Sequence, residues 1–526
     1  MAISEITPSA VKIDKLIDRV ADGDIKIPAF QRRFVWKQDQ VIELLDSIFH
    51  NYPIGSILLW NSDEQLKATR NVCGFAIPDR PLSYPVNYVL DGQQRLSTMY
   101  AVFCKDRTQD LSDSNLPELD IFDIHFDLDA GKFRSGSDLI SGNHSFPLQS
   151  LFDITAFFSA IKPLPEKYQS EVKALHSKFN NYEVPIVTIT KRSKTEVGTI
   201  FERINNTGTD LSTLDLMVAW TWSEDFHLQE KITELLEVLE GKEFSKLPQK
   251  TILQCLSAVL QESTSTKAIL ALDPKQVHGE FEGLSSSMEK AIDFLATQLN
   301  ATEDFLPHVQ QLIPLTYFFS QTNAASAKQT SWLRQWFWKT TFSRRYAAQT
   351  DEKMDSDIQL FKQFVSGTGD GLNKYGYTVT PDQLIKQTFT RNSPLVRGFL
   401  LLLAQNQPLD LVSGGYVDIG KALSEFNAKE YHHIFPRAYL KKREFPVEKV
   451  NSLCNFCFLT ADSNKEISNK PPANYFADIV PQDKFATILG SNLMPLNKEV
   501  YEKNDFEKFL SLRSQRIMEF LDMQLA

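Results

Sequence analysis

Residues 86–103 read VNYVLDGQQRLSTMYAVF, a stretch in which one hydrophobic pattern gives way to another. The segment 86–90 is rich in β-branched and aromatic side chains, which is typical of a short strand entering a sheet. The apolar side chains after it recur every three or four positions, which predicts one side of a helix. They are Leu96, Met99, Tyr100 and Phe103. The polar run 91–95 therefore lies where a strand passes into a helix.

The polar run 91–95, DGQQR, has the composition of a phosphate-binding turn. Backbone N–H groups in the first turn of a helix have no partner within the helix, and the helix dipole is positive there. Gly92 would let the backbone approach a ligand closely, and Arg95 could hold phosphate oxygens with its two-pronged guanidinium. Gln93 and Gln94 offer amides to a sugar or a base. A plainer interpretation stays open, in which Asp91 is a helix N-cap and Arg95 a solvated surface residue.

Length and composition predict a soluble protein of several domains. The chain has 526 residues, of which 42% are hydrophobic and 23% charged, as in ordinary globular proteins. The N-terminal residues lack a signal-peptide core, and the longest apolar run, 399–404, is too short to cross a bilayer. We therefore expect a cytoplasmic protein without a membrane partner. The cysteines are few and odd in number, which argues against a disulfide framework.

Two further compositional features bear on metals and nucleic acids. Cys454 and Cys457 form a C-x-x-C pair, but no second pair completes a zinc site, so we interpret both as apolar strand residues. The net charge of −10 does not favour nucleic-acid binding. Local basic clusters are nevertheless present at 31–33, 344–345 and 437–443. A nucleic-acid duplex could bind to such basic patches on an otherwise acidic protein.

The pattern of apolar and small residues along the sequence divides the chain into three predicted domains. Residues 1–220 alternate short apolar runs with helical stripes, which predicts a mixed α/β or α+β unit. Residues 221–370 carry leucines at helical spacing and few strand signals, which predicts a helical connector. A small-residue loop at 366–371 precedes a last domain, 371–526. The fold class is therefore α+β with several domains.

Aromatic and basic residues crowd together in the connector between 332 and 346. Aromatics interleaved with arginines could stack nucleic-acid bases. Helical spacing favours the alternative that Trp332, Trp336 and Phe337 face the core, leaving only the end at Arg344 and Arg345 for a partner.

A second polar constellation lies near the C-terminus, in YHHIFPRAYL and the following NSLCNFCFLTADSNKEISNKPP. It consists of adjacent histidines, His432 and His433, at the end of one predicted strand, Asn455 in a second apolar strand, and Asn464 in a helical segment. The predicted order is strand, strand, helix.

This constellation resembles the HNH nuclease module, a ββα fold that holds one divalent metal beneath the scissile phosphate. The resemblance implies that His433 is the general base, that Asn455 braces its loop, and that His432 and Asn464 are the metal ligands. A common variant of the motif has an acid where His432 stands. Because imidazole is a softer ligand than carboxylate, the site favours Mg²⁺ less than the acidic variant does, and Mn²⁺ or Ni²⁺ are alternative metals. The alternative is a pair of buried, hydrogen-bonded histidines in a hairpin.

The N-terminal part carries further motifs: IPAFQRRFVW at 27–36, PIG at 53–55, the DGQQR turn, and FERINNTG at 201–208. Together they resemble the DGQQR domain of GmrSD-type restriction endonucleases, which is similar to ParB and sulfiredoxin. The resemblance implies an NTP-binding domain, with ATP, GTP, CTP or UTP as the ligand and with NTPase activity. The implied pocket adds Gln31, Arg32 and Asn205 to the turn 91–95, and Asp91 is a candidate to position water or a metal.

Both resemblances together favour a modification-dependent endonuclease of bacterial antiphage defence, which cuts modified or foreign phage DNA under NTP control. A second copy of the chain, or another protein of a defence system, is a further candidate partner. Two alternatives stay open: a DNA- or nucleotide-sensing protein that binds without hydrolysing NTP, and a nonspecific nickase or RNase. The sequence does not indicate which base modification is read.

Overall fold

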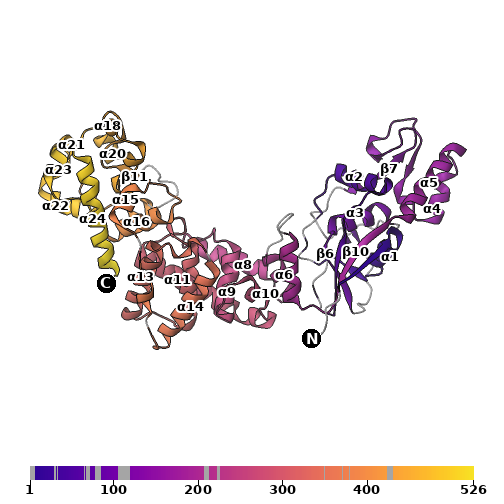
Figure 1. Cartoon of the computed structure of the whole chain (residues 1–526), viewed down its shortest axis with the longest axis horizontal. Helices are drawn as coiled ribbons and strands as arrows, with labels where there is room; N and C mark the ends of the chain where they lie inside the picture. The colour runs from indigo at the N-terminus through magenta and orange to yellow at the C-terminus, as the bar shows by residue number, and fades with distance from the viewer. Residues whose placement is uncertain are drawn as a thin grey trace. The chain divides into compact units, whose positions relative to one another are not determined.

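The computed structural model describes residues 6–28, 31, 34–63, 66, 71–76, 85–104, 119–205, 213–221, 225–348, 350–369, 371–377, 379–422 and 431–525. The chain forms two compact units, Met1–Leu228 and Gln229–Ala526 (Figure 1). The predicted connector and the predicted last domain thus lie in one unit, and the boundary near 370 stays a prediction. In the part of the chain described, no helix is both long and apolar enough to cross a lipid bilayer.

The first unit is built on a five-stranded mixed sheet with the order β1-β10-β3-β6-β2. β1 (Ile6–Lys12) pairs antiparallel with β10 (Glu183–Ile189), and β10 pairs parallel with β3 (Ile57–Ser62). β3 is antiparallel to β6 (Val86–Asp91), which is parallel to the short β2 (Ile25–Lys26). The predicted strand at 86–90 is therefore confirmed.

Helices and two small sheets complete the first unit. A three-stranded antiparallel sheet has the order β8-β7-β9, and β4 pairs with β5. The sequence had not indicated the three-stranded sheet. These small strands are β4 (Asn71–Val72), β5 (Phe75–Ala76), β7 (Ile124–Asp127), β8 (Lys132–Ser135) and β9 (Ser145–Pro147). The helices are α1 (Ile13–Ala21), α2 (Gln38–Phe49), α3 (Gln93–Phe103), α4 (Ile154–Ile161), α5 (Glu166–Asn181), α6 (Lys194–Asn205) and α7 (Thr213–Trp220).

Helix α3 begins directly after β6, as predicted, but it is buried around its whole circumference. Every residue from Leu96 to Phe103 is buried, including the polar Ser97 and Thr98. The predicted one-sided stripe is therefore too narrow a description. The difference arises because α3 contacts α1 as well as β3 and β4, so that partners distant in sequence cover the sides that the periodicity left open.

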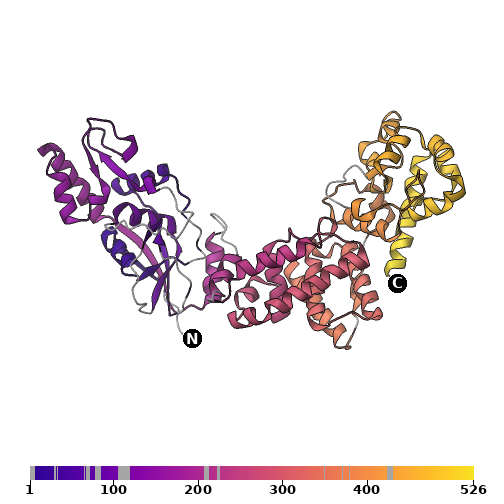
Figure 2. The same cartoon turned by 180° about the vertical axis from the view of Figure 1, so that it is seen from behind.

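The first part of the second unit is helical, as predicted (Figure 2). The predicted inward direction of Trp332, Trp336 and Phe337 is confirmed, since all three are buried. The helices are α8 (Leu228–Glu240), α9 (Gln249–Gln261), α10 (Thr266–Leu270), α11 (Pro274–Leu299), α12 (Leu312–Gln321), α13 (Ala327–Phe342) and α14 (Thr350–Val365).

The remainder of the second unit surrounds a small antiparallel hairpin, β11 (Tyr431–His433) paired with β12 (Phe456–Phe458). Arg513 of the long helix α24 is fully buried and donates hydrogen bonds to Cys454 O (2.7 Å) and Asn492 O (3.1 Å), which ties α24 to the hairpin. The helices are α15 (Pro381–Lys386), α16 (Pro394–Gln405), α17 (Ile419–Ala422), α18 (Arg437–Lys441), α19 (Val447–Val450), α20 (Ala461–Ile467), α21 (Pro472–Asp478), α22 (Phe485–Ser491), α23 (Lys498–Glu502) and α24 (Phe506–Leu525).

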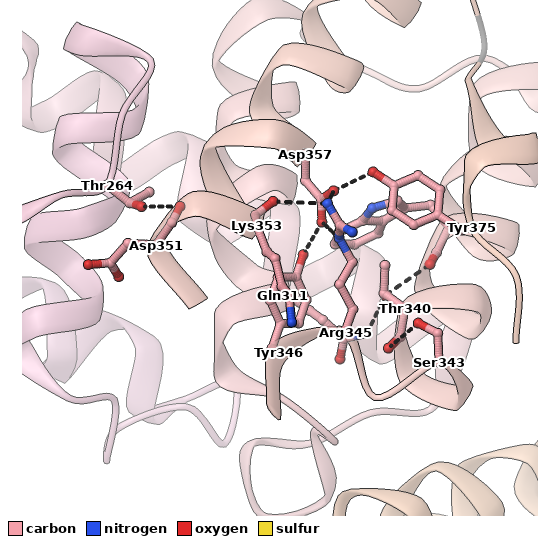
Figure 3. A network of polar contacts seen from close by, with 11 residues as sticks. Thr264, Gln311, Thr340, Ser343, Arg345, Tyr346, Asp351, Lys353, Asp357 and Tyr375 are labelled. Carbon is pink, nitrogen blue, oxygen red and sulfur yellow. Dashed lines mark hydrogen bonds and ion pairs between the residues drawn. The ribbon is translucent and has the colours of Figure 1, made fainter. Parts of the chain in front are cut away.

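Asp357 of α14 is the centre of a buried polar network in this unit (Figure 3). Its carboxylate accepts hydrogen bonds from Arg345 (Nε, 2.9 Å), Tyr346 and Tyr375, and Arg345 Nη2 lies 2.7 Å from its second oxygen. Burial raises the pKa of both tyrosines, so both remain protonated donors. The network therefore joins α14 to the segment after α13 and to the segment before α15.

The substitution Asp357→Ala should lower the free energy of unfolding by about 3 kcal/mol, because it leaves a buried guanidinium and two buried hydroxyls without their shared acceptor. Urea denaturation of the full chain, followed by circular dichroism, measures this loss. Glu352→Ala removes the same charge from an exposed position of the same helix and should change stability by less than about 0.5 kcal/mol. Equal effects of the two substitutions would contradict the role of the network.

Candidate functional site

The DGQQR turn and the histidine hairpin belong to separate units, and each has its own geometry. In the first unit, Gly92 has a φ of +85°, and a Cβ at this position would lie 3.1 Å from Ile57 Cα. Glycine is therefore required by both its backbone conformation and its contact with β3. The register of β3 against β6 also shifts here, pairing Leu58 with Asp91 and Leu59 with Val89. This bulge leaves one extra residue in β6 and bends the strand immediately before the turn.

Arg95 is directed back toward the loop that precedes β3. Its Nη1 donates to Ile54 O at 2.7 Å, and its Nη2 lies 3.2 Å from Asp91 Oδ2. Gly55, with a φ of +80°, makes room for the guanidinium, since a Cβ there would lie 2.1 Å from Arg95 Nη1. The side chain of Arg95 is 20% exposed and that of Asp91 45% exposed. Arg95 is therefore a partly buried residue of a formed site and not a freely solvated one.

Gln31 and Gln94 connect the turn to the segment 31–36. Gln31 Nε2 donates to the carbonyl oxygens of Val89 and Leu90, each at 3.0 Å. Gln94 is buried, and its Oε1 accepts from Val35 N at 2.9 Å. These amides therefore fix the shape of the turn, whereas the sequence suggested that they would contact a ligand.

The other predicted nucleotide-binding residues are less fully placed. Gln93 occupies the first position of α3 and is half-buried. Arg32 lies outside the described residues, and Asn205 ends α6 with its side chain outside the description. The structure thus brings together Gln31, the turn 91–95 and the Gly55 loop. This arrangement offers a helix N-terminus, a held cation and a half-exposed carboxylate, a combination suited to a phosphate with its metal counter-ion.

In the second unit, His433 is held by an asparagine that the sequence did not single out. Its Nε2 lies 3.0 Å from Asn451 Oδ1, and its ring lies 4.4 Å from that of Phe456, its cross-strand neighbour. Burial lowers the pKa of His433, with Arg437 adding to the effect and the Asn451 bond opposing it. The neutral ring predominates at pH 7, and because an amide oxygen only accepts, Nε2 carries the proton. Nδ1 is then left with a lone pair, as a general base requires.

His432 is the neighbour of His433 on the same strand, so its side chain points to the opposite face of the hairpin. It is 9% exposed, and its Nε2 is buried without a hydrogen-bond partner among the described residues. The pKa of His432 is lowered to about 4, mainly by burial and also by the nearby His433, while Asp410 opposes the shift. His432 is therefore neutral at pH 7, with one ring nitrogen uncommitted.

Asn455 is fully buried and fixes the segment that follows β11. Its Oδ1 accepts from Phe435 N at 2.9 Å, and its Nδ2 donates to Phe435 O at 3.1 Å and to Val450 O at 2.9 Å. A main-chain bond from Ile434 N to Asn455 O (2.8 Å) continues the contact. One side chain thus joins the end of the histidine strand to the turn before Asn451.

Asn464 lies on α20, whose N-terminus is organised by the buried Asp410. The carboxylate of Asp410 accepts from Thr460 N at 3.1 Å and from Ser463 Oγ at 2.7 Å. The negative charge of Asp410 also raises the pKa of His432, against the larger effect of burial. The side chain of Asn464 is half-buried and makes no hydrogen bond within the described parts of the chain.

The donor set at the hairpin is compatible with a metal. No three His, Cys, Asp or Glu side chains converge as ligands anywhere in the described ranges. His432 nevertheless presents a neutral imidazole with a buried, unpartnered nitrogen, which is the state in which imidazole binds metals. The unused amide of Asn464 and the nearby charge of Asp410 suit a divalent cation. Cys454 and Cys457 are both buried, and burial raises their pKa to about 12, which disfavours the thiolate form that binds metal.

Gly55, Asn451 and Asp410 were not identified from the sequence. The PIG motif at 53–55 was a signal for Gly55, but its role depends on Arg95, which lies far along the chain. Asn451 meets His433, and Asp410 meets the start of α20, only in the folded unit, and neither stands in a recognisable spacing.

Truncation to alanine should lower the free energy of unfolding much more at Asn455 than at Asn464. Asn455→Ala should lower the free energy of unfolding by about 3 kcal/mol, because three buried backbone groups lose their partner. Asn464→Ala should cost less than about 1 kcal/mol, because its side chain makes no such bonds. Denaturant titration of both variants tests this difference. An Asn455→Ala protein as stable as Asn464→Ala would show that the three hydrogen bonds of Asn455 are unimportant for folding.

Two comparisons with known proteins identify relatives of this chain. Residues 13–222 match the family model described as the GmrSD restriction endonuclease, N-terminal domain. The chain is also similar to the uncharacterized protein MJ0686 of Methanocaldococcus jannaschii, with 24% identity over an alignment covering 98% of this chain and 99% of that protein. The match to the GmrSD domain spans nearly the whole first unit and supports a relationship with GmrSD-like restriction endonucleases.

Proposed function

We propose that this protein is an NTP-regulated, metal-dependent HNH endonuclease that restricts modified or foreign phage DNA. The GmrSD match of the first unit supports a restriction nuclease, and DNA is the substrate that such an enzyme implies. The observation that carries the chemistry is the hydrogen bond from His433 to Asn451, because it leaves a lone pair on Nδ1 of a neutral imidazole.

In this proposal His433 removes a proton from the water that attacks the phosphodiester. Asn451 orients the ring, and Asn455 holds the backbone beyond β11 so that the ring keeps its position. His432 and Asn464 would hold a divalent metal, Mg²⁺ or Mn²⁺ or, given the imidazole, Ni²⁺. When bound, the metal stabilises negative charge on the phosphate and the leaving oxygen.

The first unit is proposed to bind ATP, GTP, CTP or UTP at the DGQQR turn. The α3 N-terminus and Arg95 supply attraction for phosphate, and Asp91 would hold the accompanying metal. Once a nucleotide binds, the Arg95 guanidinium can exchange its Asp91 bond for phosphate oxygens, because both side chains are partly exposed.

A second candidate keeps nucleotide binding but removes hydrolysis. Gln31 Nε2 and Gln94 Oε1 both bond to backbone groups, so these two atoms are not available to orient an attacking water. This observation favours a sensor that binds NTP without cleaving it. Measuring phosphate release from each NTP, with and without DNA, distinguishes the two candidates.

The proposed function is tested directly by incubating the purified protein with modified and unmodified phage DNA. Each NTP and each divalent metal is supplied or omitted in turn. Cleavage that needs a metal and changes with NTP supports the proposal. Absence of cleavage under every combination would refute it.

The substitution His433→Ala should abolish DNA cleavage, because it removes the general base, and should leave DNA binding nearly unchanged. It also removes the bond to Asn451 and the contact with Phe456, so the unfolding midpoint should fall modestly while the protein stays folded. His278→Ala, on α11 of the same unit, serves as a matched control and should cut at the wild-type rate. If His433→Ala also cuts at the wild-type rate, the assignment of the cutting site is wrong.

The substitution Arg95→Ala should weaken NTP binding by about 1.5–3 kcal/mol, the value of a hydrogen bond to a charged group. It should also remove the NTP response of cleavage and retain basal cutting. Arg19→Ala is the control, because Arg19 is also a half-buried arginine of the first unit, paired with Asp24 at 2.5 Å. Calorimetry measures both affinities, and equal losses in the two variants would return Arg95 to a structural role.

A further inference from the structure

A cation-lined pocket lies in the second unit, outside the proposed catalytic residues. Its volume is ≈ 320 Å³, and it is lined by Arg344, Val379, Gln383, Lys386, Gln387 and Leu395. Among the described residues, the lining thus includes two cations and two amides but no carboxylate. On a chain with a net charge of −10, such a lining favours an anion.

Arg344 is the most informative residue of this pocket. It follows the C-terminus of α13 with a φ of +53°, a left-handed conformation that is unfavourable for a residue with a Cβ. Its side chain is exposed and forms no ion pair or hydrogen bond within the described ranges. The adjacent Arg345, by contrast, is engaged by Asp357. Because a left-handed residue is common just past a helix C-terminus, it is the exposed guanidinium at the pocket, and not the backbone, that favours a binding role.

Lys386 supplies the second cation, from the last turn of α15. It pairs with Asp382 at 2.6 Å, but both side chains are more than two-thirds exposed, at 75% and 71%. Such a surface pair contributes little stability. Lys386 can therefore turn toward a phosphate at small cost.

The chain that leaves this pocket runs directly to the histidine hairpin. Gln387 O accepts from Leu453 N at 2.7 Å, and Phe389 N donates to Asn451 O at 2.8 Å. The Phe389 ring stacks on that of Phe456, with centroids 4.1 Å apart, and Phe456 lies against His433. The pocket and the proposed general base are thus parts of one packed assembly, joined through Asn451.

We propose that this pocket binds a backbone phosphate of duplex DNA flanking the phosphodiester that His433 attacks. The proposal rests on the nuclease function of the hairpin. Arg344 and Lys386 contact phosphate oxygens, and the amides of Gln383 and Gln387 line the same space. Contacts of this kind position a duplex without reading its sequence, so the pocket contributes affinity and register and no base specificity.

DNA affinity is measured in a His433→Ala background, so that the duplex stays intact. Fluorescence anisotropy with a labelled duplex gives the affinity between about 50 and 200 mM salt. The variants are Arg344→Asn, which keeps a side chain tolerant of the left-handed conformation, and Lys386→Gln. Lys275→Gln removes the same charge from an exposed position of α11 and is the matched control.

Each pocket variant should bind about tenfold more weakly and lower the salt slope of log K by about 0.9, the value for one lost phosphate contact. The effect should be the same for unrelated duplex sequences, and Lys275→Gln should show neither change. Arg344→Asn should also leave the thermal unfolding midpoint equal or raised, because strain is relieved. A purely structural Arg344 would lower that midpoint instead.

The outcomes separate this proposal from the nuclease function. If the wild-type protein cuts DNA but both pocket variants bind with unchanged affinity and salt slope, the pocket assignment is overturned and the nuclease stands. If the variants lose affinity and slope while the wild-type protein never cuts, the phosphate contact is supported and the nuclease function fails. Absence of any DNA binding by the wild-type chain overturns the pocket assignment.

Discussion

The side-chain amide of Asn455 makes three hydrogen bonds in a site from which water is excluded, and the geometry of the second unit depends on them. An amide can pair with both groups of a peptide unit at once, and Asn455 does so with Phe435. Its third bond, to Val450 O, holds the turn that carries Asn451. The position of His433 is therefore fixed from both sides, by the strand that contains it and by the turn that supplies its hydrogen-bond acceptor. A hydrophobic residue of similar size could fill the space but could not connect these two segments.

The same principle operates at the DGQQR turn with other residues. Gln31 and Gln94 use their amides on main-chain groups, and Gly55 leaves room for the Arg95 guanidinium. Most of the polar side chains of this motif thus stabilise the conformation of the turn. Preorganisation of this kind matters for anion binding, because a guanidinium already held in place loses less entropy when a phosphate arrives. The polar residues of a motif can therefore be indispensable for a ligand that they never touch.

Periodicity predicted the elements that depend on local pattern and missed the features that depend on distant partners. The strand β6, the start of α3 and the inward direction of Trp336 follow from spacing alone. The full burial of α3 does not, because α1 and β4 cover sides that the sequence stripe left polar or small. Gln94 was expected to face a ligand, yet its partner, Val35 N, lies 59 positions away and could not be identified without the fold. Asn451 and Asp410 were not identified from the sequence for the same reason. His433, Asn455 and Asn464 were singled out because a known motif has their spacing, but the two asparagines have different environments that spacing does not distinguish.

The acidic balance of the chain takes on a different meaning once the basic residues are placed. Among the arginines singled out from the sequence, Arg345 is neutralised by a buried aspartate and Arg95 by a half-exposed one. Arg344 has no such partner in the described structure and lies at a pocket without carboxylates. Net charge governs long-range attraction, which salt screens within about 10 Å at 0.1 M ionic strength. Binding to a phosphate at contact distance depends instead on which cations remain unpaired. If the hairpin cuts DNA as proposed, an acidic protein of this design attracts DNA weakly from afar and binds it where an unpaired arginine lines a pocket next to the hairpin segment. Contact is then confined to the place where cutting is useful.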